Sequence, residues 1–448
     1  MNCELCIIGA GPGGYRAAEL AAKAGLKVVI IEAGHVGGTC LNVGCIPTKS
    51  LARNAEIVQT LKDSALFGLQ NLSYELDFTQ VIARKNQVID GLRNGIEGLL
   101  AHPNITVVRG RARFLDAHTV ACQTTAGDDM EEVVVTAPHI IIATGSENKV
   151  LPGIEGFVTH EQLLRLERLP QRLCIIGAGV IGMEFASIFS SFGVEVTVVE
   201  FLKECLPALD SDIAKRLRKV LEKRGVTFCM QCAVKNVENG MVTYENRKGQ
   251  LATVEADLVL MAVGRKPRVS DDFRCAGFDY DERQGIRVNE HFETTVPGIY
   301  AIGDVNGRQM LAHAAEMQGI HVVNRLLGLA DDIRFDIMPA AIFTHPEAAC
   351  VGLSEDQCKA QGIAYECRKA FHRANGKAHA MNEVEGMVKL LCDPEGRIIG
   401  CHAFGAHSAD MVQEVSVLMC RQTTIAQLRD MVHIHPTLSE IVLAAATV

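Results

Sequence analysis

No stretch of the 448-residue sequence approaches about 18 uninterrupted apolar residues, so no membrane-spanning helix is expected. No secretory signal is expected either, because Met1 leads almost directly into the short apolar segment 5–8 and a glycine-rich turn follows at once. The net charge of −9 is modest for this length and argues against a nucleic-acid-binding surface. We therefore expect a soluble, cytoplasmic protein of several domains, with neither a membrane nor a nucleic acid as its partner.

The 16 cysteines show no spacing typical of a disulfide framework. In a reducing cytoplasm most of them should be free thiols that pack as small apolar residues. Two C-x-x-C matches, Cys3/Cys6 and Cys229/Cys232, fall in segments with the alternating pattern of strands. Residues three apart on a strand point to opposite faces, so we expect neither pair to be a metal or redox site.

A glycine-rich pattern occurs twice, each time between two apolar segments and before a helical stretch. The two copies have their fingerprint glycines and their terminal carboxylate at matching positions: Gly9, Gly11, Gly14 and Glu32 in the first, and Gly177, Gly179, Gly182 and Glu200 in the second. In both copies the acidic residue follows the first glycine by 23 positions (32 − 9 and 200 − 177). Two copies with the same context are far less easily explained by helix–strand packing alone than one copy would be.

Each copy has the pattern of a dinucleotide-binding βαβ unit. The first glycine allows a tight turn, the second allows the backbone to approach a pyrophosphate at the helix N-terminus, and the third allows close helix–strand packing. The carboxylate can accept hydrogen bonds from ribose hydroxyls. Two copies predict two different dinucleotides. Glu200 is followed by Phe-Leu-Lys without an arginine, which favours NAD over NADP, with Lys203 as a minor reservation.

Cys40 and Cys45 lie just after the first βαβ unit and precede Pro47 and Lys49. Residues five apart on a regular helix have Cα atoms about 8.6 Å apart. A disulfide needs about 4.4–6.8 Å, so a bridge requires a distorted first turn, which the glycine at 44 tolerates. A position at the start of a helix also favours the thiolate. We favour a redox-active pair over the alternative of two buried structural thiols.

The segment 40–49, which reads CLNVGCIPTK, resembles the pyridine nucleotide–disulfide oxidoreductase family, whose members carry FAD, NAD(P) and a C-x-x-x-x-C disulfide. The resemblance covers essentially the whole chain. It implies an α/β fold with two Rossmann-like dinucleotide-binding domains, for FAD and for NAD, and a C-terminal α+β dimerisation domain. Within the family, the segment is most similar to the enzymes that oxidise dihydrolipoamide with NAD⁺.

The resemblance implies four regions. Residues 1–146 would be the first part of the FAD domain, with an antiparallel insert at about 107–135 around a turn at 126–129. Residues 147–266 would form the NAD domain, 267–336 a central region that completes the FAD site, and 337–448 the interface domain of a homodimer. A helix is expected over 78–101, covering the flavin region.

The family motifs imply further site residues. Glu184 would pair with Lys49 beside the flavin N5, and Asp304 would bind the ribityl chain. The helix that opens near 311 would direct its N-terminus at the flavin pyrimidine ring. The remaining residues assigned to cofactor binding are Gly38, Thr39, Thr144, Gly145, Gly264, Leu311, Ala312 and His313.

The segment 433–440 matches the acid–base motif of the family. It implies that His435 exchanges protons with dihydrolipoamide and with Cys40, and that Glu440 orients the imidazole. In the family this motif reaches the disulfide of the other subunit. The spacing of His433 and His435 also suggests a metal site, but no third ligand accompanies them, so no metal is expected.

Other disulfide reductases of the family fit the sequence less well. A glutathione-type enzyme is disfavoured by Glu200 and Thr48, and a mercuric-type enzyme by the lack of a C-terminal cysteine pair, because the last cysteine is Cys420. A non-catalytic scaffold would be expected to lose part of the motif set, and none is lost. The implied partner is the lipoyl domain of a 2-oxoacid dehydrogenase complex or of the glycine cleavage system.

Overall fold

The computed structural model describes residues 1–124 and 132–447. The chain divides into two compact units, each assembled from separate segments. The first comprises Met1–Ser50, Ile82–Lys149 and Gly264–Ile333, and the second comprises Leu51–Val81, Val150–Val263 and Arg334–Val448. The turn expected at 126–129 lies outside the described residues.

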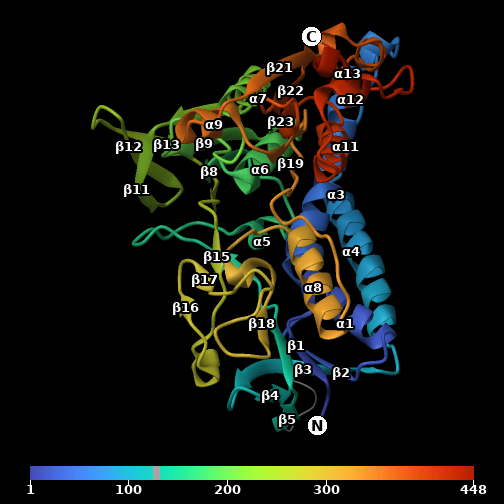
Figure 1. Ribbon diagram of the computed structural model, residues 1–448. Coiled ribbons are helices and arrows are strands. Elements are labelled where there is room, and N and C mark those ends of the chain that lie inside the picture. Colours follow the sequence, from blue (N-terminus) through green and yellow to red (C-terminus); the bar gives the residue numbers. More distant parts are fainter. Residues whose placement is uncertain (125–131, 448) are drawn as a thin grey trace. The chain divides into compact units, whose positions relative to one another are not determined.

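The first unit is built on a seven-stranded sheet in the order β18-β6-β1-β2-β3-β4-β5 (Figure 1). Five of its strands form a parallel array: β18 (Ile299–Ala301), β6 (His139–Ile142), β1 (Leu5–Ile8), β2 (Val28–Glu32) and β3 (Ile105–Phe114). The far end of β3 continues as an antiparallel array with β4 (Thr119–Thr124) and β5 (Glu132–Thr136). The continuous apolar run of β1 is typical of a parallel strand that is covered on both faces.

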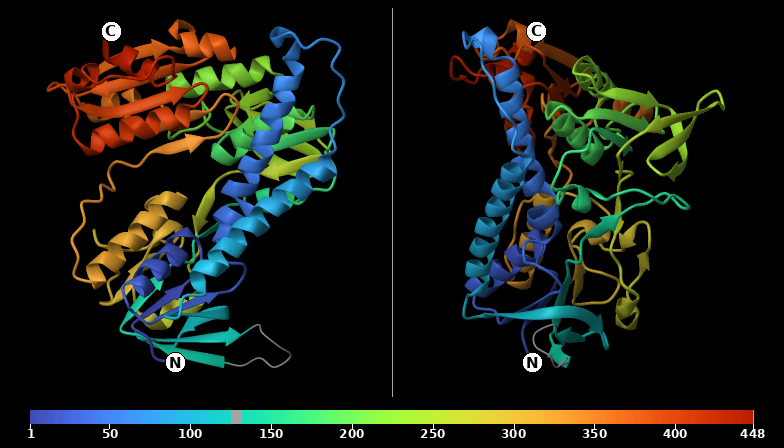
Figure 2. Two further views of the ribbon diagram at one scale, coloured as in Figure 1. Left: turned by 90° about the vertical axis from the view of Figure 1, so that its right-hand side faces the viewer. Right: turned by 180° about the vertical axis from the view of Figure 1, so that it is seen from behind.

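Helix α1 (Pro12–Lys23) connects β1 to β2 and packs against α8 (Ala312–Leu326), as Figures 1 and 2 show. Glycines make this close approach possible. A Cβ atom on Gly13 would lie 2.7 Å from the carbonyl oxygen of Ala315, and one on Gly319 would lie 2.8 Å from the carbonyl oxygen of Gly13. The predicted helix over 78–101 is α4 (Phe78–Leu100).

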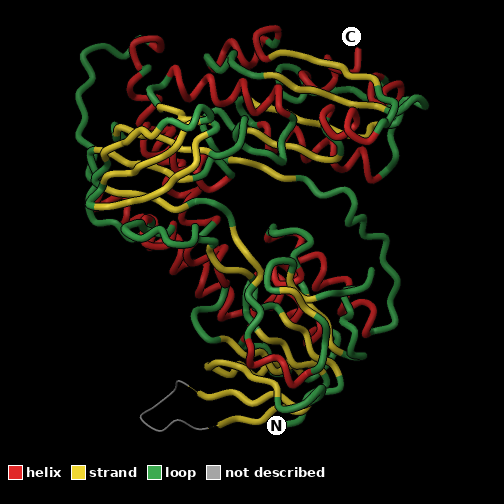
Figure 3. The backbone as a smooth tube through the Cα atoms, turned by 90° about the vertical axis from the view of Figure 1, so that its left-hand side faces the viewer, coloured by secondary structure: helices red, strands yellow, loops and turns green. Residues whose placement is uncertain are grey.

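The second unit contains a parallel four-stranded sheet in the order β10-β9-β8-β14. Its strands are β10 (Thr227–Met230), β9 (Glu195–Glu200), β8 (Arg172–Ile176) and β14 (Leu258–Met261). Helix α6 (Val180–Ser191) connects β8 to β9, and α7 (Ser211–Lys223) connects β9 to β10. Beside it lies an antiparallel sheet of β11 (Cys232–Glu238), β12 (Met241–Asn246) and β13 (Leu251–Glu255). Figure 3 shows these strands in yellow.

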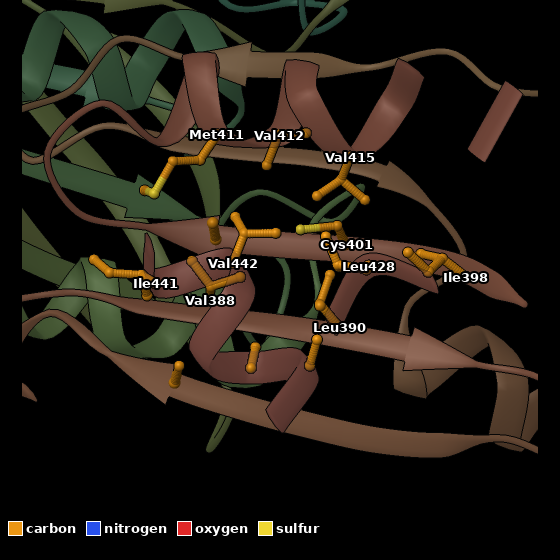
Figure 4. Packing of buried hydrophobic residues seen from close by; sticks show 14 of the residues in the cluster. Val388, Leu390, Ile398, Cys401, Met411, Val412, Val415, Leu428, Ile441 and Val442 are labelled. Atoms are coloured by element: carbon orange, nitrogen blue, oxygen red, sulfur yellow. The ribbon is translucent and has the colours of Figure 1, made fainter. Parts of the chain in front are cut away.

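The C-terminal part of the second unit is an antiparallel five-stranded sheet in the order β19-β20-β23-β22-β21. Its strands are β19 (Ala340–Ile342), β20 (Ala348–Gly352), β23 (Ile398–Phe404), β22 (Met387–Cys392) and β21 (Glu366–Phe371). The helices α11 (Ser408–Cys420), α12 (Ile425–Arg429) and α13 (Glu440–Thr447) contribute to its core. In Figure 4, Val412 and Val415 of α11 and Val442 of α13 point toward Val388 and Cys401 of the sheet.

The predicted fold class is confirmed: two parallel Rossmann-like sheets and a C-terminal α+β domain. That neither C-x-x-C pair is a metal or redox site stays a prediction, but the argument that their members point to opposite faces was wrong. Cys3 and Cys6 belong to one buried cluster, and Cys232 and Cys229 belong to another. The chain leaves the extended conformation between the members of each pair, at a bend on Glu4 and at Gln231, whose φ is 57°.

Candidate active site

The first glycine turn is closed by Glu32 at the end of β2. The carboxylate accepts a hydrogen bond from the backbone N–H of Ala10 at 2.7 Å and another from Gly34 at 2.7 Å. Gly9 has a φ of 106°, and α1 begins just after Gly11 with no side chain capping its N-terminus. Exposed N–H groups of a helix N-terminus and a positive helix end suit a pyrophosphate.

The second glycine turn repeats this hydrogen bonding. Glu200 accepts from the N–H of Ala178 at 2.5 Å and from the N–H of Leu202 at 2.6 Å. Gly177 has a φ of 104°, and α6 follows Gly179, again with no side-chain cap. A carboxylate oxygen has two acceptor positions, so each glutamate keeps capacity for ribose hydroxyls while it holds its turn. Both turns therefore fit a dinucleotide.

Cys40 and Cys45 lie on two different helices. Helix α2 (Gly38–Val43) contains Cys40 and ends at Gly44, and α3 (Cys45–Lys62) begins with Cys45. Gly44 has φ −139° and ψ −108°, and a Cβ atom there would lie 2.9 Å from the carbonyl oxygen of Thr39. The break at Gly44 is the distorted turn that the five-residue spacing requires.

The side chains of the two cysteines lie within hydrogen-bond distance of each other. A hydrogen bond with Cys45 raises the pKa of the Cys40 thiol, and burial raises it further, whereas the charge of Lys49 acts in the opposite direction. The sequence led us to expect a lowered pKa from the helix start. In the dithiol form the partner sulfur and the loss of water outweigh that effect for Cys40.

Asp304 lies in the short helix η3 (Gly303–Asn306) and is joined to two residues that the sequence analysis missed. Ser146 donates a hydrogen bond from its hydroxyl to Asp304. Arg265 donates to the Ser146 hydroxyl at 2.7 Å and to its carbonyl oxygen at 2.8 Å. Burial raises the pKa of Asp304, while the bond from Ser146 lowers it. Ser146 and Arg265 each directly follow a glycine assigned to cofactor binding, which is the one signal that could have identified them.

Helix α8 starts behind Leu311 without a side-chain cap, so the N–H groups of its first turn are open to a ligand. Gln318 of the same helix is buried and fixes η3, because its side-chain oxygen accepts from the N–H of Gly303 at 2.8 Å and from the amide of Asn306 at 2.9 Å. The helix N-terminus and Asp304 are therefore held together within the first unit.

The first unit contains all residues predicted to bind FAD: Gly9, Gly11, Gly14, Glu32, Gly38, Thr39, Lys49, Thr144, Gly145, Asp304, Leu311, Ala312 and His313. Gly264, also assigned to cofactor binding, belongs to this unit as well, at its boundary. Glu184 lies in the second unit, where its buried carboxylate accepts from the N–H of Phe343 at 2.9 Å. The pair of Glu184 with Lys49 stays a prediction.

His435 and Glu440 form a hydrogen-bonded pair in the second unit. His435 Nδ1 lies 2.9 Å from one Glu440 oxygen, and the other oxygen accepts from the N–H of Thr437 at 2.9 Å. These two bonds lower the pKa of Glu440. Because a carboxylate can only accept, Nδ1 carries the proton, and a neutral ring presents the lone pair of Nε2. The ring is 78% exposed, so this lone pair is accessible.

His433 has a different environment. Its Nε2 lies 2.9 Å from a Glu414 oxygen and its Nδ1 3.0 Å from the carbonyl oxygen of Met431. Both ring nitrogens are thus occupied in a side chain that is only 8% exposed. Among residues 1–124 and 132–447, no group of three or more histidine, cysteine, aspartate or glutamate side chains could hold a metal ion. In the same part of the chain, no helix is both long and apolar enough to span a bilayer.

Similar proteins were found for the whole chain. A dihydrolipoyl dehydrogenase of Arabidopsis thaliana, named as mitochondrial, is 38% identical over 456 residues, covering 99% of this chain and 89% of that protein. The dihydrolipoyl dehydrogenase of Chlamydia muridarum is 36% identical over 447 residues, covering 98% and 95%. The structure of the HOCl-induced flavoprotein disulfide reductase RclA from Escherichia coli has a TM-score of 0.87 and 30% identity, covering 99% of both chains.

Two family descriptions match the chain. "Pyridine nucleotide-disulphide oxidoreductase" matches residues 3–319, and the dimerisation domain of the same family matches residues 338–446. The second match spans the five-stranded sheet and its helices. The chain therefore belongs to the pyridine nucleotide-disulphide oxidoreductase family, as an oxidoreductase that uses FAD and NAD.

Proposed function

We propose that the chain oxidises dihydrolipoamide to lipoamide, through the Cys40–Cys45 pair, and reduces NAD⁺ to NADH. The observation that carries this proposal is the His435–Glu440 pair, which supplies an oriented base whose free nitrogen faces outward. A dithiol substrate needs such a base to become a thiolate at neutral pH. Full-length relatives named dihydrolipoyl dehydrogenase support the same substrate.

In the proposed reaction the enzyme starts with a Cys40–Cys45 disulfide. His435 Nε2 takes a proton from one substrate thiol, and the resulting thiolate attacks the Cys40 sulfur. The bond between the two cysteine sulfurs breaks, and Cys45 leaves as a thiolate. The second substrate thiol then attacks the substrate sulfur of the mixed disulfide between substrate and Cys40. This forms the disulfide of lipoamide, breaks the bond to Cys40 and leaves Cys40 reduced. FAD, which the first glycine turn and Asp304 would hold, would supply a two-electron acceptor between the dithiol and NAD⁺.

His435 is proposed to act on the disulfide of a partner subunit in a homodimer. The dimerisation domain supports an assembly of two chains. The residues around the base also favour burial against a partner, because Val432 is 99% exposed and Ile434 is 79% exposed in the single chain. Large apolar side chains grouped at this degree of exposure are typical of an interaction surface. Each active site would then need residues from two chains.

The cofactor assignments are based on the two glycine turns and the half-buried Asp304. We assign the first turn, Asp304 and the N-terminus of α8 to FAD, and the second turn with Glu200 to NAD. Lys49 and Glu184 are proposed to form a pair beside the flavin N5. The regions 1–146, 147–266, 267–336 and 337–448 are proposed as the FAD, NAD, central and interface domains.

We further propose that the substrate is carried on the lipoyl domain of a 2-oxoacid dehydrogenase complex or of the glycine cleavage system, and that the protein acts in the cytoplasm. The 16 cysteines lack the spacing of a disulfide framework, which favours a reducing compartment. Cell fractionation would test the location, and recovery in an oxidising compartment would contradict it.

Steady-state assays test the proposed function. We expect rapid NADH formation from free dihydrolipoamide and NAD⁺, and little oxidation of NADPH by glutathione disulfide. A purified flavoprotein that turned over glutathione disulfide with NADPH, but not dihydrolipoamide with NAD⁺, would contradict the assignment. On reduction by two electrons, a thiolate beside oxidised flavin should also give a long-wavelength charge-transfer absorbance.

A further inference from the structure

Arg93 of α4 is bound to the helix that carries Cys40. Its Nε and Nη2 atoms donate to the side-chain oxygen of Asn42 at 3.1 and 2.8 Å. Asn42 lies in α2, between the two cysteines in sequence. Its side-chain nitrogen donates in turn to the carbonyl oxygens of Val36 and Gly38, each at 2.9 Å. All four bonds join groups of the first unit, and we call them the Arg93–Asn42 clamp.

Helix α2 needs support from outside, because it has only six residues. A helix of that length is unstable alone in water. Its N-cap, Gly37, is in the left-handed region with a φ of 95° and provides no side-chain cap, and its far end stops at Gly44. The clamp supplies what is missing. It joins Asn42, near the C-terminal end of α2, to the carbonyl oxygens of Gly38 and Val36, and it joins the same residue to the long helix α4.

Arg93 fixes which way the Asn42 amide points. The oxygen of an amide can only accept and its nitrogen can only donate. With the guanidinium bound to the oxygen, the nitrogen must face the carbonyl groups of Val36 and Gly38. Two charge-assisted bonds from one planar group hold this orientation better than water or a single donor would.

A surface ion pair with Asp90 alone does not explain the contacts of Arg93. Its Nη1 pairs with Asp90 at 3.0 Å, one turn earlier on α4. However, the Arg93 side chain is only 22% exposed, against 64% for Asp90. Exposed pairs of this kind contribute little to stability.

We infer that Arg93 is a positioning residue for the Cys40–Cys45 pair, an inference that rests on the proposed redox function. It holds α2 so that the Cys40 sulfur stays within reach of Cys45, and it thereby favours the disulfide over the dithiol. Disulfide formation from the two thiols releases two protons and two electrons, which an external disulfide such as oxidised dithiothreitol accepts. The closer the two sulfurs are held, the more this equilibrium favours the protein disulfide.

The test is a redox titration of the FAD-bound protein in buffers of reduced and oxidised dithiothreitol. The Cys40–Cys45 disulfide is quantified by alkylation and peptide mass, which separates it from the other 14 cysteines. We expect Arg93→Met to move the equilibrium about tenfold toward the dithiol, equivalent to about 30 mV for a two-electron couple. Arg93→Lys, which keeps the charge but not the planar pair of donors, should give a smaller shift.

Two further variants sharpen the test. Asn42→Ala should shift the equilibrium as Arg93→Met does, and the double variant should shift it no further, because both changes remove the same clamp. Asp90→Asn is the matched control. It removes the exposed ion pair and keeps both bonds to Asn42, so its equilibrium should stay within about twofold of the wild type. If Arg93→Met loses its FAD, Arg93→Lys and the Asn42 variant decide the question.

An equilibrium within about twofold of wild type for Arg93→Met and Arg93→Lys would overturn the inference, as would a shift in Asp90→Asn as large as in Arg93→Met. Failure of the proposed function looks different. Wild-type protein that forms a reversible Cys40–Cys45 disulfide but does not oxidise dihydrolipoamide would refute the proposed substrate, but not the proposed role of the Arg93–Asn42 clamp. Wild-type protein that never forms the disulfide would refute both.

Discussion

The two glycine turns have the same internal hydrogen bonds, but the chain that follows them differs. In both, the carboxylate at the end of the second strand binds the residue after the first glycine. In both, the chain then returns to that residue: the N–H of Gly37 donates to Ala10 at 2.7 Å, and the N–H of Leu206 donates to Ala178 at 2.9 Å. The likeness extends beyond the glycine fingerprint into the loop behind it.

The difference begins at the next residue. After Gly37, the chain passes over the first turn, where a Cβ atom on Gly38 would lie 2.7 Å from the Cα of Gly11. At the second turn, a Cβ atom on Gly179 would meet no other atom within 4 Å. Phe201, in the loop of the second turn, is 73% exposed. The first turn is thus covered by the segment that carries Cys40, whereas the second is open.

This contrast suits a cofactor that stays bound and one that must exchange. A dinucleotide enclosed at the first turn would dissociate slowly, and one at the open second turn can enter and leave in each catalytic cycle. The assignment of FAD to the first turn and NAD to the second agrees with this difference. The predictions that follow test each side of it.

The largest effect is expected at the covered turn. Cys45→Ser should reduce the oxidation of dihydrolipoamide to the background rate, because no disulfide can form, while FAD stays bound. Flavin absorbance of the purified protein and steady-state rates would measure both properties. Cys275→Ser, which changes an exposed cysteine, is the control and should behave as wild type. Loss of FAD in Cys45→Ser would show that the pair also supports the turn.

The second-largest effect is expected at His435, and it separates flavin reduction by dihydrolipoamide from flavin reduction by NADH. His435→Ala should slow reduction of the flavin by dihydrolipoamide by about 10²–10⁴-fold, the range of a lost general base. Reduction by NADH should change little, because it does not need that base. Rapid-mixing spectroscopy of the flavin follows both half-reactions. Equal slowing of both would show that His435 is not the base of the thiol reaction.

A matched pair of glycine substitutions tests the contrast between the two turns directly. Gly38→Ala puts a methyl group against Gly11, at a residue with a φ of 59°, so we expect protein with little FAD. Gly179→Ala meets no protein atom, so we expect normal folding and FAD content. Its methyl group should instead crowd a pyrophosphate at α6, raising KM for NAD⁺ about tenfold with a smaller change in kcat. Normal FAD in Gly38→Ala would contradict the idea of a covered turn.

Much of this architecture could be predicted from the sequence, because its signals are local. Glycine, helix and carboxylate follow one another within 24 residues in each copy, and the covalent spacing of Cys40 and Cys45 alone requires a distorted turn. Contacts between distant segments could not be predicted. Arg265 reaches Ser146 from 119 positions away, and Arg93 reaches Asn42 from 51. A single left-handed residue, Gln231, was enough to invalidate the strand argument for Cys229 and Cys232.

The smallest predicted effect concerns stability in acid and is specific to the second unit. His402 is buried in β23, and its Nδ1 accepts the N–H of Asp210 at 3.1 Å, so it must be neutral. Burial lowers the pKa of His402 to about 4, and Lys389, which binds Asp210 at 2.7 Å, acts in the same direction. Burial also lowers the pKa of His345 to about 4.

An unfolded histidine has a pKa of about 6.5, so the unfolded chain binds these protons first. Stability should therefore be full above about pH 6.5 and fall as the pH decreases toward 4, by roughly 1–3 kcal/mol for each histidine. Urea unfolding of the holoprotein at several pH values would measure this slope. His402→Asn should unfold more easily at neutral pH and lose less stability on acidification. An unchanged slope would mean that His402 takes up its proton in the folded protein, and that the bond to Asp210 is not what keeps it neutral.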